Sequence, residues 1–119
     1  MVKVLMIDDD KDIQETIGPL LNVLYGHDVI PAFDGKHALD VLANIKGINI
    51  IFCDYNMPVL NGYGFLSQLR NNPKFSSYSN IPVIGIGDFP ENKRELLTEF
   101  KTKPFSYHEL NDLIKKYCS

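Results

Sequence analysis

An apolar run that ends on a carboxylate constrains the fold of this chain more than any other feature. Residues 48–53 are largely apolar, Asp54 follows them directly, and Gly47 and Pro58 bound the stretch. A run of this length and composition predicts a strand that helices bury on both faces, as in a parallel sheet. Asp54 then lies at the carboxyl end of its strand, the edge where open α/β sheets bind their ligands.

A second predicted strand, residues 2–7, also ends on carboxylates, here the acidic triplet Asp8, Asp9 and Asp10. If the two strands are parallel neighbours, these acids meet Asp54 at one edge of the sheet, and like charges that close require a cation or a proton. Carboxylate oxygens at an open edge suit Mg²⁺. An acidic triplet can also simply cap a helix. We expect that role for Asp10 and the metal-binding role for Asp8 and Asp9.

Strands and helices alternate along the whole chain. Apolar periodicity and the placement of Gly and Pro predict strands at residues 2–7, 27–33, 48–54, 82–87 and 100–102. The same signals predict helices at about residues 11–25, 35–45, 62–70, 91–99 and 107–117, with a polar loop over residues 71–80. Strict alternation implies a parallel sheet with helices on both faces. We predict an α/β, doubly wound, flavodoxin-like fold with five strands in the order 2-1-3-4-5 and five helices.

Two sets of apolar residues are expected to be buried. Alternate positions of the strands that end on acids should lie under helices on one side or the other; these are Val4, Met6, Ile51 and Cys53. In the first helix, apolar residues recur at helical spacing and predict one buried stripe, made of Ile13, Ile17, Leu20, Leu21 and Leu24.

Composition excludes several classes of protein. The chain has 119 residues, is 45% hydrophobic and 23% charged, and carries a net charge of −3. These values predict a single globular domain over residues 1–119 and argue against nucleic-acid binding, which requires a basic face. No apolar run approaches membrane-spanning length, and no signal peptide opens the chain.

Cys53 and Cys118 fit a reduced cytoplasmic location without a disulfide. His27, His37 and His108 are too scattered for a metal site, and we expect each at the surface or a strand edge.

Four pieces of sequence, in this order, carry a family resemblance. They are the acids after the first strand, CDYNMPVLNG at residues 53–62, IPVIGIG at residues 81–87 and KPF at residues 103–105. Over essentially its whole length the chain resembles the receiver domain of two-component response regulators. The resemblance implies that Asp54 accepts a phosphoryl group as an acyl phosphate.

The same resemblance assigns roles to the residues around Asp54. It implies that Asp9 and Asp54 bind Mg²⁺ directly, that Asp8 binds it partly through water, and that the backbone carbonyl of Asn56 completes the protein's share of the ligands. Lys103 would pair with Asp54 and then with the phosphoryl oxygens, and its bond to Pro104 would be cis. The structural alternatives are a turn-capping Asp54 and a surface Lys103.

The resemblance fails at the end of the fourth strand. Receiver domains have a serine or threonine there, followed by a small residue, whereas this chain has Gly87 and Asp88. The hydroxyl that would bond the phosphoryl group is missing, and we expect the space beside Gly87 to be open. Phe100, at the aromatic switch position three residues before Lys103, could then lie inward without any modification. The segment from Gly87 to Lys103 is also short, so the fourth helix should be reduced.

Three functions remain open on the sequence. The first is a phosphoacceptor receiver domain that takes its phosphoryl group from a phosphohistidine on a sensor histidine kinase or phosphotransfer protein, acts on a downstream output protein or domain, and catalyses only its own phosphorylation and dephosphorylation. The second is a degenerate receiver that binds a protein partner without phosphorylation, which Gly87 and Asp88 favour. The third is a haloacid-dehalogenase-type phosphatase, but that class needs an acid where Asn56 stands.

Overall fold

Five parallel strands form one sheet in the order β2-β1-β3-β4-β5, as the alternating pattern predicted. The computed structural model describes residues 2–119. Every neighbouring pair of strands is parallel. The strands are β1 (Lys3–Ile7), β2 (Asp28–Ala32), β3 (Ile50–Asp54), β4 (Val83–Ile86) and β5 (Glu99–Lys101). The predicted fold class and strand order are therefore confirmed.

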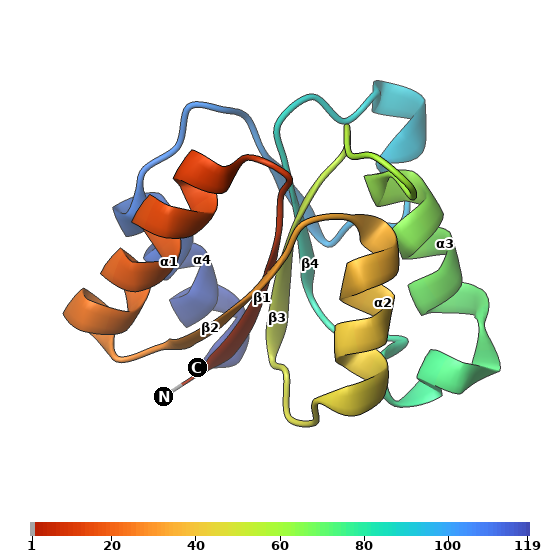
Figure 1. Ribbon diagram of the computed structural model, residues 1–119, viewed down its shortest axis with the longest axis horizontal. Helices are drawn as coiled ribbons and strands as arrows, with labels where there is room; N and C mark the ends of the chain where they lie inside the picture. The colour runs from red at the N-terminus through yellow and green to blue at the C-terminus, as the bar shows by residue number, and fades with distance from the viewer. Residues whose placement is uncertain (1) are drawn as a thin grey trace.

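Helices cover both faces of the sheet (Figure 1). The α-helices are α1 (Lys11–Tyr25), α2 (Gly35–Asn44), α3 (Gly62–Asn71) and α4 (Tyr107–Cys118), and two 3₁₀ helices are η1 (Pro73–Tyr78) and η2 (Glu91–Lys93). Helices α1 and α4 lie side by side on one face, and α2 and α3 lie on the other. None of the helices described here is long and apolar enough to cross a membrane.

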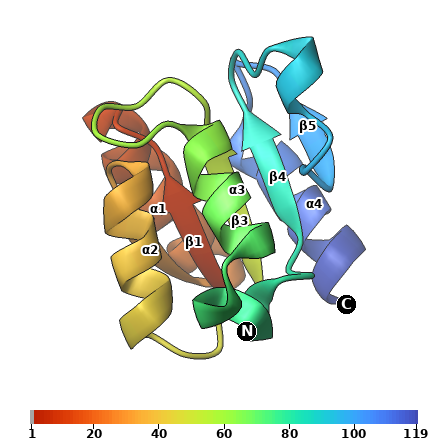
Figure 2. The same ribbon diagram turned by 90° about the vertical axis from the view of Figure 1, so that its right-hand side faces the viewer.

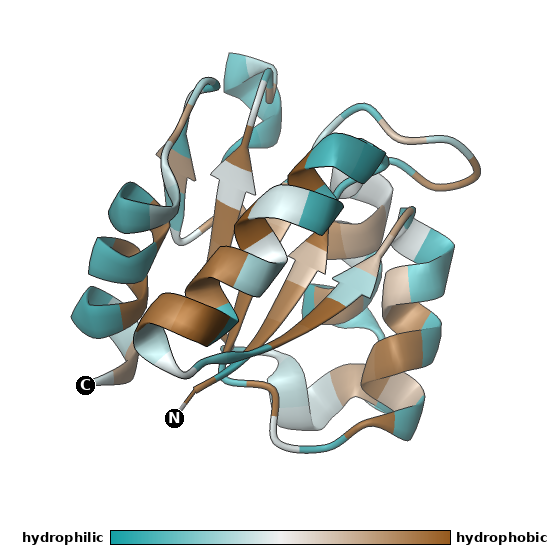
Figure 3. Ribbon diagram, turned by 60° about the vertical axis from the view of Figure 1, so that its left-hand side comes forward, coloured by the Kyte–Doolittle hydropathy of each residue, from teal (hydrophilic) through white to brown (hydrophobic). Residues whose placement is uncertain are grey.

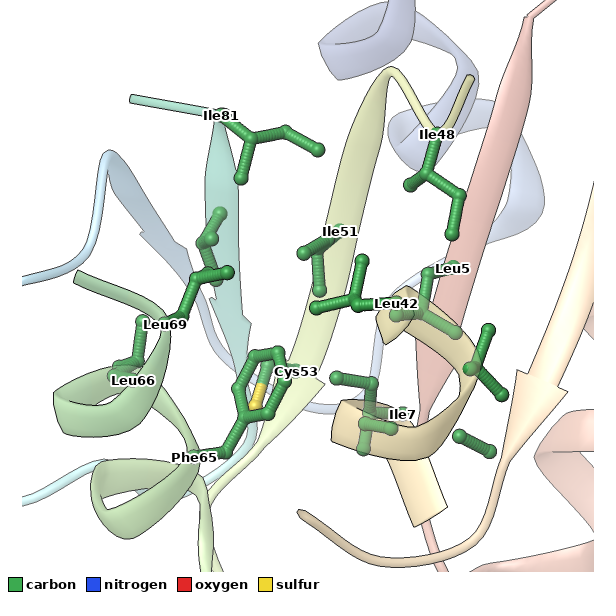
Figure 4. Packing of buried hydrophobic residues seen from close by; sticks show 14 of the residues in the cluster. Leu5, Ile7, Leu42, Ile48, Ile51, Cys53, Phe65, Leu66, Leu69 and Ile81 are labelled. Atoms are coloured by element: carbon green, nitrogen blue, oxygen red, sulfur yellow. The ribbon is translucent and has the colours of Figure 1, made fainter. Parts of the chain in front are cut away.

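The central strands are buried on both faces, as their continuous apolar runs predicted. Alternate residues of β1 point to opposite sides: Val4 and Met6 pack among residues of α1 and α4, whereas Leu5 and Ile7 pack toward α2 and α3. Figure 4 shows the second of these cores, where the side chains of β1 and β3 meet those of α2 and α3. The predicted burial of Val4, Met6, Ile51 and Cys53 is confirmed, since each is 0% exposed.

Helix α1 buries a different face from the predicted one. The residues against the sheet are Gln14, Gly18 and Leu21, whereas Leu24 is 52% exposed and Ile13, Ile17 and Leu20 are half-buried. The C-terminal end of α1 therefore presents an apolar surface, brown in Figure 3. Two contacts hold this face on the sheet. Gly18 lies against Val29 of β2, where a Cβ would be 3.5 Å from Cγ1 of Val29, and the Gln14 amide donates to the backbone carbonyls of Met6, Asp8 and Ala32. Of the predicted stripe, only Leu21 is fully buried.

The segment between β4 and β5 lacks the predicted helix at residues 91–99. Only the single turn η2 forms there, and β5 follows as a short strand beside β4 (Figure 2). The sequence explains this result, because Leu96 and Leu97 are adjacent and the rest of the stretch is polar, so no apolar stripe could face the sheet. The expected polar loop over residues 71–80 instead contains η1.

Of the two positions expected for His27, surface or strand edge, the structure shows the second: it directly precedes the edge strand β2 but is buried. It is 8% exposed, and its Nε2 lies 2.8 Å from Oδ1 of Asn111 in α4. The buried polar Asn111 gives Nε2 of the imidazole a partner, whereas Nδ1 has none among the described residues 2–119. His37 and His108 are exposed, as expected.

Candidate functional site

The acids predicted to converge do so at the carboxyl edge of the sheet. Ile7 of β1 is in register with Cys53 of β3, so the residues that follow them, Asp8 and Asp54, lie on adjacent strand ends. Oxygens of Asp8, Asp9 and Asp54 lie within 4.8 Å of one another. Asp8 is 0% exposed and Asp54 is 7% exposed, whereas Asp9 is open to solvent. Two buried acids thus meet one that faces water.

Each buried carboxylate has one oxygen fixed by the backbone and one turned to the same cation. Asp8 Oδ1 accepts the Asp10 N–H at 2.9 Å, and Asp54 Oδ1 accepts the Tyr55 N–H at 2.8 Å. The two Oδ2 atoms lie 3.1 Å and 3.5 Å from Nζ of Lys103. Asp8 Oδ2 is buried, and within residues 2–119 it accepts no hydrogen bond of good geometry. This oxygen retains capacity for a further ligand.

Two buried carboxylates share the single positive charge of Lys103, and this imbalance shifts the pKa values of the site. Burial, followed by the charge of Asp8, raises the pKa of Asp54 to about 6, although Lys103 lowers it. Burial acts to lower the pKa of Lys103, but the charges of Asp8 and Asp54 outweigh it, so that pKa is raised. The site therefore favours additional positive charge, supplied by a proton or a metal ion.

The residues at this edge fit a hard divalent cation. All three acids offer oxygen, and exposed Asp9 leaves the site open to the waters that Mg²⁺ keeps. The buried Asp8 Oδ2 lies 3.1 Å from Nζ of Lys103 but accepts no hydrogen bond of good geometry from the described residues 2–119. Asn56 is exposed in the loop after β3, and its backbone carbonyl remains a predicted ligand. The predicted role of Asp10 as a helix N-cap is confirmed, since its carboxylate accepts hydrogen bonds from the N–H groups of Asp12 and Ile13.

Lys103 reaches the acids from the loop that follows β5. The peptide bond between Lys103 and Pro104 is cis, as the resemblance implied. Together these residues form a constellation of three acids and one lysine drawn from the ends of three strands. The sequence matches the response regulator receiver domain over residues 4–115. The chain belongs to the response regulator receiver domain family.

Several known proteins resemble this receiver domain over most of its length. It is 39% identical to Protein PilG of Pseudomonas aeruginosa, over 98% of this chain and 87% of PilG. The solved Francisella response regulator 1452 receiver domain is 35% identical, with a TM-score of 0.81 over 98% of this chain and 96% of that one. The magnesium-bound receiver domain of sensor histidine kinase PA1611 from P. aeruginosa shares the fold, with a TM-score of 0.81 at 23% identity over 98% and 96% of the two chains. This chain spans only 46% of the length of two longer curated relatives.

In this receiver domain the space beside Gly87 is not open, contrary to the prediction. Gly87 has φ of +89°, and a Cβ on it would lie 2.7 Å from Asp54 Oδ1 and 3.5 Å from Cε of Lys103. The Asp54 carboxylate and the Lys103 side chain occupy the place that a side chain on Gly87 would take. Asp88 is exposed and is not among the acids that cluster within 4.8 Å. Phe100 is half-buried, packed against the α2–α3 core.

Sequence reasoning missed the residues that support this edge of the receiver domain. Phe89 is 1% exposed and packs edge-on against Tyr55 with ring centroids 5.3 Å apart. Gly62 begins α3 where a Cβ would lie 2.2 Å from the carbonyl oxygen of Asp54. Arg94 lies over the ring of Phe100, with its Cζ 4.1 Å from the centroid. An isolated phenylalanine in a polar loop was the one available signal, but it does not reveal which residues it contacts.

Proposed function

We propose that residues 1–119 act as a phosphoacceptor receiver domain, in which Asp54 takes a phosphoryl group from a phosphohistidine with the help of Mg²⁺. The observation that carries the proposal is Nζ of Lys103, which lies 3.1 Å and 3.5 Å from two buried carboxylates at the ligand-binding edge of the sheet. Family membership supports it, since receiver domains are signalling modules rather than metabolic enzymes.

Asp54 is the proposed nucleophile. One of its carboxylate oxygens attacks phosphorus, an O–P bond forms as the P–N bond of the phosphohistidine breaks, and the bonding pair returns to the imidazole. The product is an acyl phosphate, and hydrolysis by water regenerates the carboxylate. Lys103 pairs with Asp54 before the transfer and with phosphoryl oxygens after it. The domain would thus catalyse only its own phosphorylation and dephosphorylation.

Asp8, Asp9, Asp54 and the backbone carbonyl of Asn56 would hold the metal ion. Bound there, Mg²⁺ neutralises the charge that develops on the phosphoryl oxygens. Asp8 supports this proposal because it is fully buried and its Oδ2, 3.1 Å from Nζ of Lys103, accepts no hydrogen bond of good geometry within residues 2–119. This oxygen lies on the side of Lys103 and Asp54. The repulsion between the carboxylates of Asp8 and Asp54 makes a bound cation favourable there.

A sensor histidine kinase or phosphotransfer protein is the proposed donor. Next to Lys103, an apolar hollow of about 380 Å³ is lined by Ile13 and Ile17 of α1 and by Pro104 and Phe105. A donor helix that presents apolar side chains could fill it and bring its phosphohistidine to Asp54. An output protein or domain would then bind the modified receiver, and we propose no nucleic-acid or membrane contact for this domain.

The second candidate is a receiver that binds its partner without phosphorylation. Two observations favour it: Gly87 offers no hydroxyl to a phosphoryl group, and the helix before β5 is reduced to η2. Both changes remove parts that receiver domains use to respond to modification. Neither change replaces one of the acids or Lys103, which is why we rank acceptor function first.

Beryllofluoride with Mg²⁺ separates the two candidates. Added to isotope-labelled protein, it should shift the amide resonances around Asp54 and Lys103, and Asp54→Asn should abolish those shifts. Mg²⁺ without beryllofluoride is the control for metal binding alone. If the spectrum with both matches the spectrum with Mg²⁺ alone, the acceptor proposal fails and the interaction module is favoured.

A further inference from the structure

Arginine side chains, rather than a helix, hold the segment between β4 and β5. Within residues 87–98, all of which the structure describes, η2 is the only helical turn. Arg70 of α3 donates from Nε and Nη2 to the carbonyl of Leu96, both at 3.2 Å. Arg94 donates from Nε at 3.0 Å and from Nη2 at 2.8 Å to the carbonyl of Phe89. Hydrogen bonds from a charged donor are stronger than neutral ones, so both ends of the segment are fixed.

Arg94 makes a second contact with the same guanidinium group. Its Cζ lies 4.1 Å from the centroid of the Phe100 ring, a cation–π arrangement. Phe100 belongs to β5 and is half-buried. The planar group is therefore held in place by the Phe89 carbonyl while it covers the aromatic ring. A rotation of Phe100 away from this position would cost the cation–π contact without a replacement for it.

Phe89 joins this pair to the acceptor edge. Its ring is 1% exposed and packs against Tyr55, whose N–H donates to Oδ1 of Asp54. The ring packs against Gly62 and Gly85, where an added Cβ would lie only 2.8 Å and 3.1 Å from its atoms. The guanidinium of Arg94 thus bonds the backbone carbonyl of a residue with a buried ring while it lies over the ring of Phe100.

We propose that Arg94 is a lock that keeps Phe100 in one orientation, so that the surface of β5 stays the same whether or not Asp54 is modified. For its effect on the modified protein, the inference rests on the proposed acceptor function. A second orientation becomes populated only if some interaction favours it over the first. In this chain Gly87 has no hydroxyl that could favour another orientation of the Phe100 ring. Arg94 stabilises the orientation that the structure shows, in which its guanidinium lies over that ring.

The test compares Arg94→Ala with Lys93→Ala in the protein of residues 1–119. Lys93 is the matched control because it is adjacent, carries the same charge, and places its Nζ 4.4 Å from the Tyr63 ring rather than near Phe100. Both proteins and the parent are labelled with 4-fluorophenylalanine, and Phe100→Leu identifies the Phe100 signal in the ¹⁹F spectrum. Without any ligand, Arg94→Ala should move or broaden that signal several-fold more than Lys93→Ala does. Equal effects in the two variants would overturn the lock.

Arg94→Lys keeps the test decisive if the alanine variant does not fold. Lysine retains the charge but loses the planar fork that bonds the carbonyl and stacks on the ring. We expect the Phe100 signal to move in this variant too, and an unchanged signal would count against the lock. The amide of Thr98, which donates to the Val83 carbonyl at 2.8 Å, reports whether the end of the segment is intact.

Beryllofluoride with Mg²⁺ provides the second part of the test. The Phe100 signal should stay nearly fixed in the parent and move in Arg94→Ala. A large movement in the parent would show that Arg94 does not lock the ring. If no adduct forms at Asp54 in any protein, the acceptor proposal fails, while the ligand-free comparison still decides whether Arg94 holds Phe100.

Discussion

The Cα of Gly87 closes over the acceptor carboxylate, because a Cβ at this position would lie 2.7 Å from Oδ1 of Asp54. Real Cβ atoms do not approach other heavy atoms so closely, and the φ of +89° is itself one that side-chain-bearing residues avoid. The missing hydroxyl is therefore not an empty position that a larger residue could refill. The backbone has taken a course that requires glycine.

Gly87→Ala should destabilise the protein. The positive φ alone costs about 1–3 kcal/mol for a residue with a Cβ, and the contact with Asp54 adds to that figure. Gly87→Thr should cost at least as much, instead of restoring a working hydroxyl. Urea unfolding monitored by circular dichroism measures the change. A variant as stable as the parent would mean that the backbone relaxes freely at this position.

Lys103→Met should strengthen Mg²⁺ binding but lower the stability of the metal-free protein. Lys103 is the cation that now balances Asp8 and Asp54, so its removal leaves their repulsion uncompensated until a metal ion binds. Titration calorimetry should give a lower dissociation constant for Mg²⁺ than in the parent. Lys103→Arg, which keeps the charge, is the control. Weaker Mg²⁺ binding in Lys103→Met would contradict a site in which lysine and metal share the same oxygens.

Asp9→Asn should weaken Mg²⁺ binding strongly with little loss of stability. Asp9 is exposed, so its charge contributes little to folding, but it supplies one of the three acid ligands of the proposed site. Asp12→Asn, an exposed acid at the start of α1, is the matched control. Unchanged affinity in Asp9→Asn would remove this residue from the metal site.

The stability of the metal-free protein should fall as pH rises between about 4 and 6. The pKa of Asp54 is about 6 in the folded protein against an ordinary value of 3.8, so in this range the folded state binds more protons than the unfolded state. Stability is then lost as the folded carboxylate ionises. Asp54→Asn removes this dependence, and its advantage over the parent should grow with pH in urea unfolding series. A constant difference across the range would contradict the raised pKa.

The site was predictable where it follows from strand order. Because β1 and β3 are neighbours, acids at their carboxyl ends must meet, and the sequence identified Asp8 and Asp54 from their positions alone. The layered fold followed in the same way from alternating strands and helices. These features depend on topology, which the spacing of apolar and turn residues determines.

The failures occurred where contacts between distant segments decide the outcome. The buried face of α1 depends on Gly18 against Val29 and on the three carbonyls bonded by Gln14. The φ of Gly87 and the contacts of Arg94 depend on a segment that has no periodic pattern. Sequence periodicity reports which residues are apolar, but it does not report which carbonyl an arginine will reach.

Chemical trapping of the acceptor residue tests the central claim most directly. The protein is incubated with acetyl phosphate and Mg²⁺, then treated with borohydride, which reduces an aspartyl phosphate to homoserine. Peptide mass spectrometry locates the altered residue, with Asp54→Asn and a reaction with chelator as controls. The proposed function predicts homoserine at position 54 alone, only when Mg²⁺ is present. No conversion at any position, or conversion elsewhere that persists in Asp54→Asn, would contradict it.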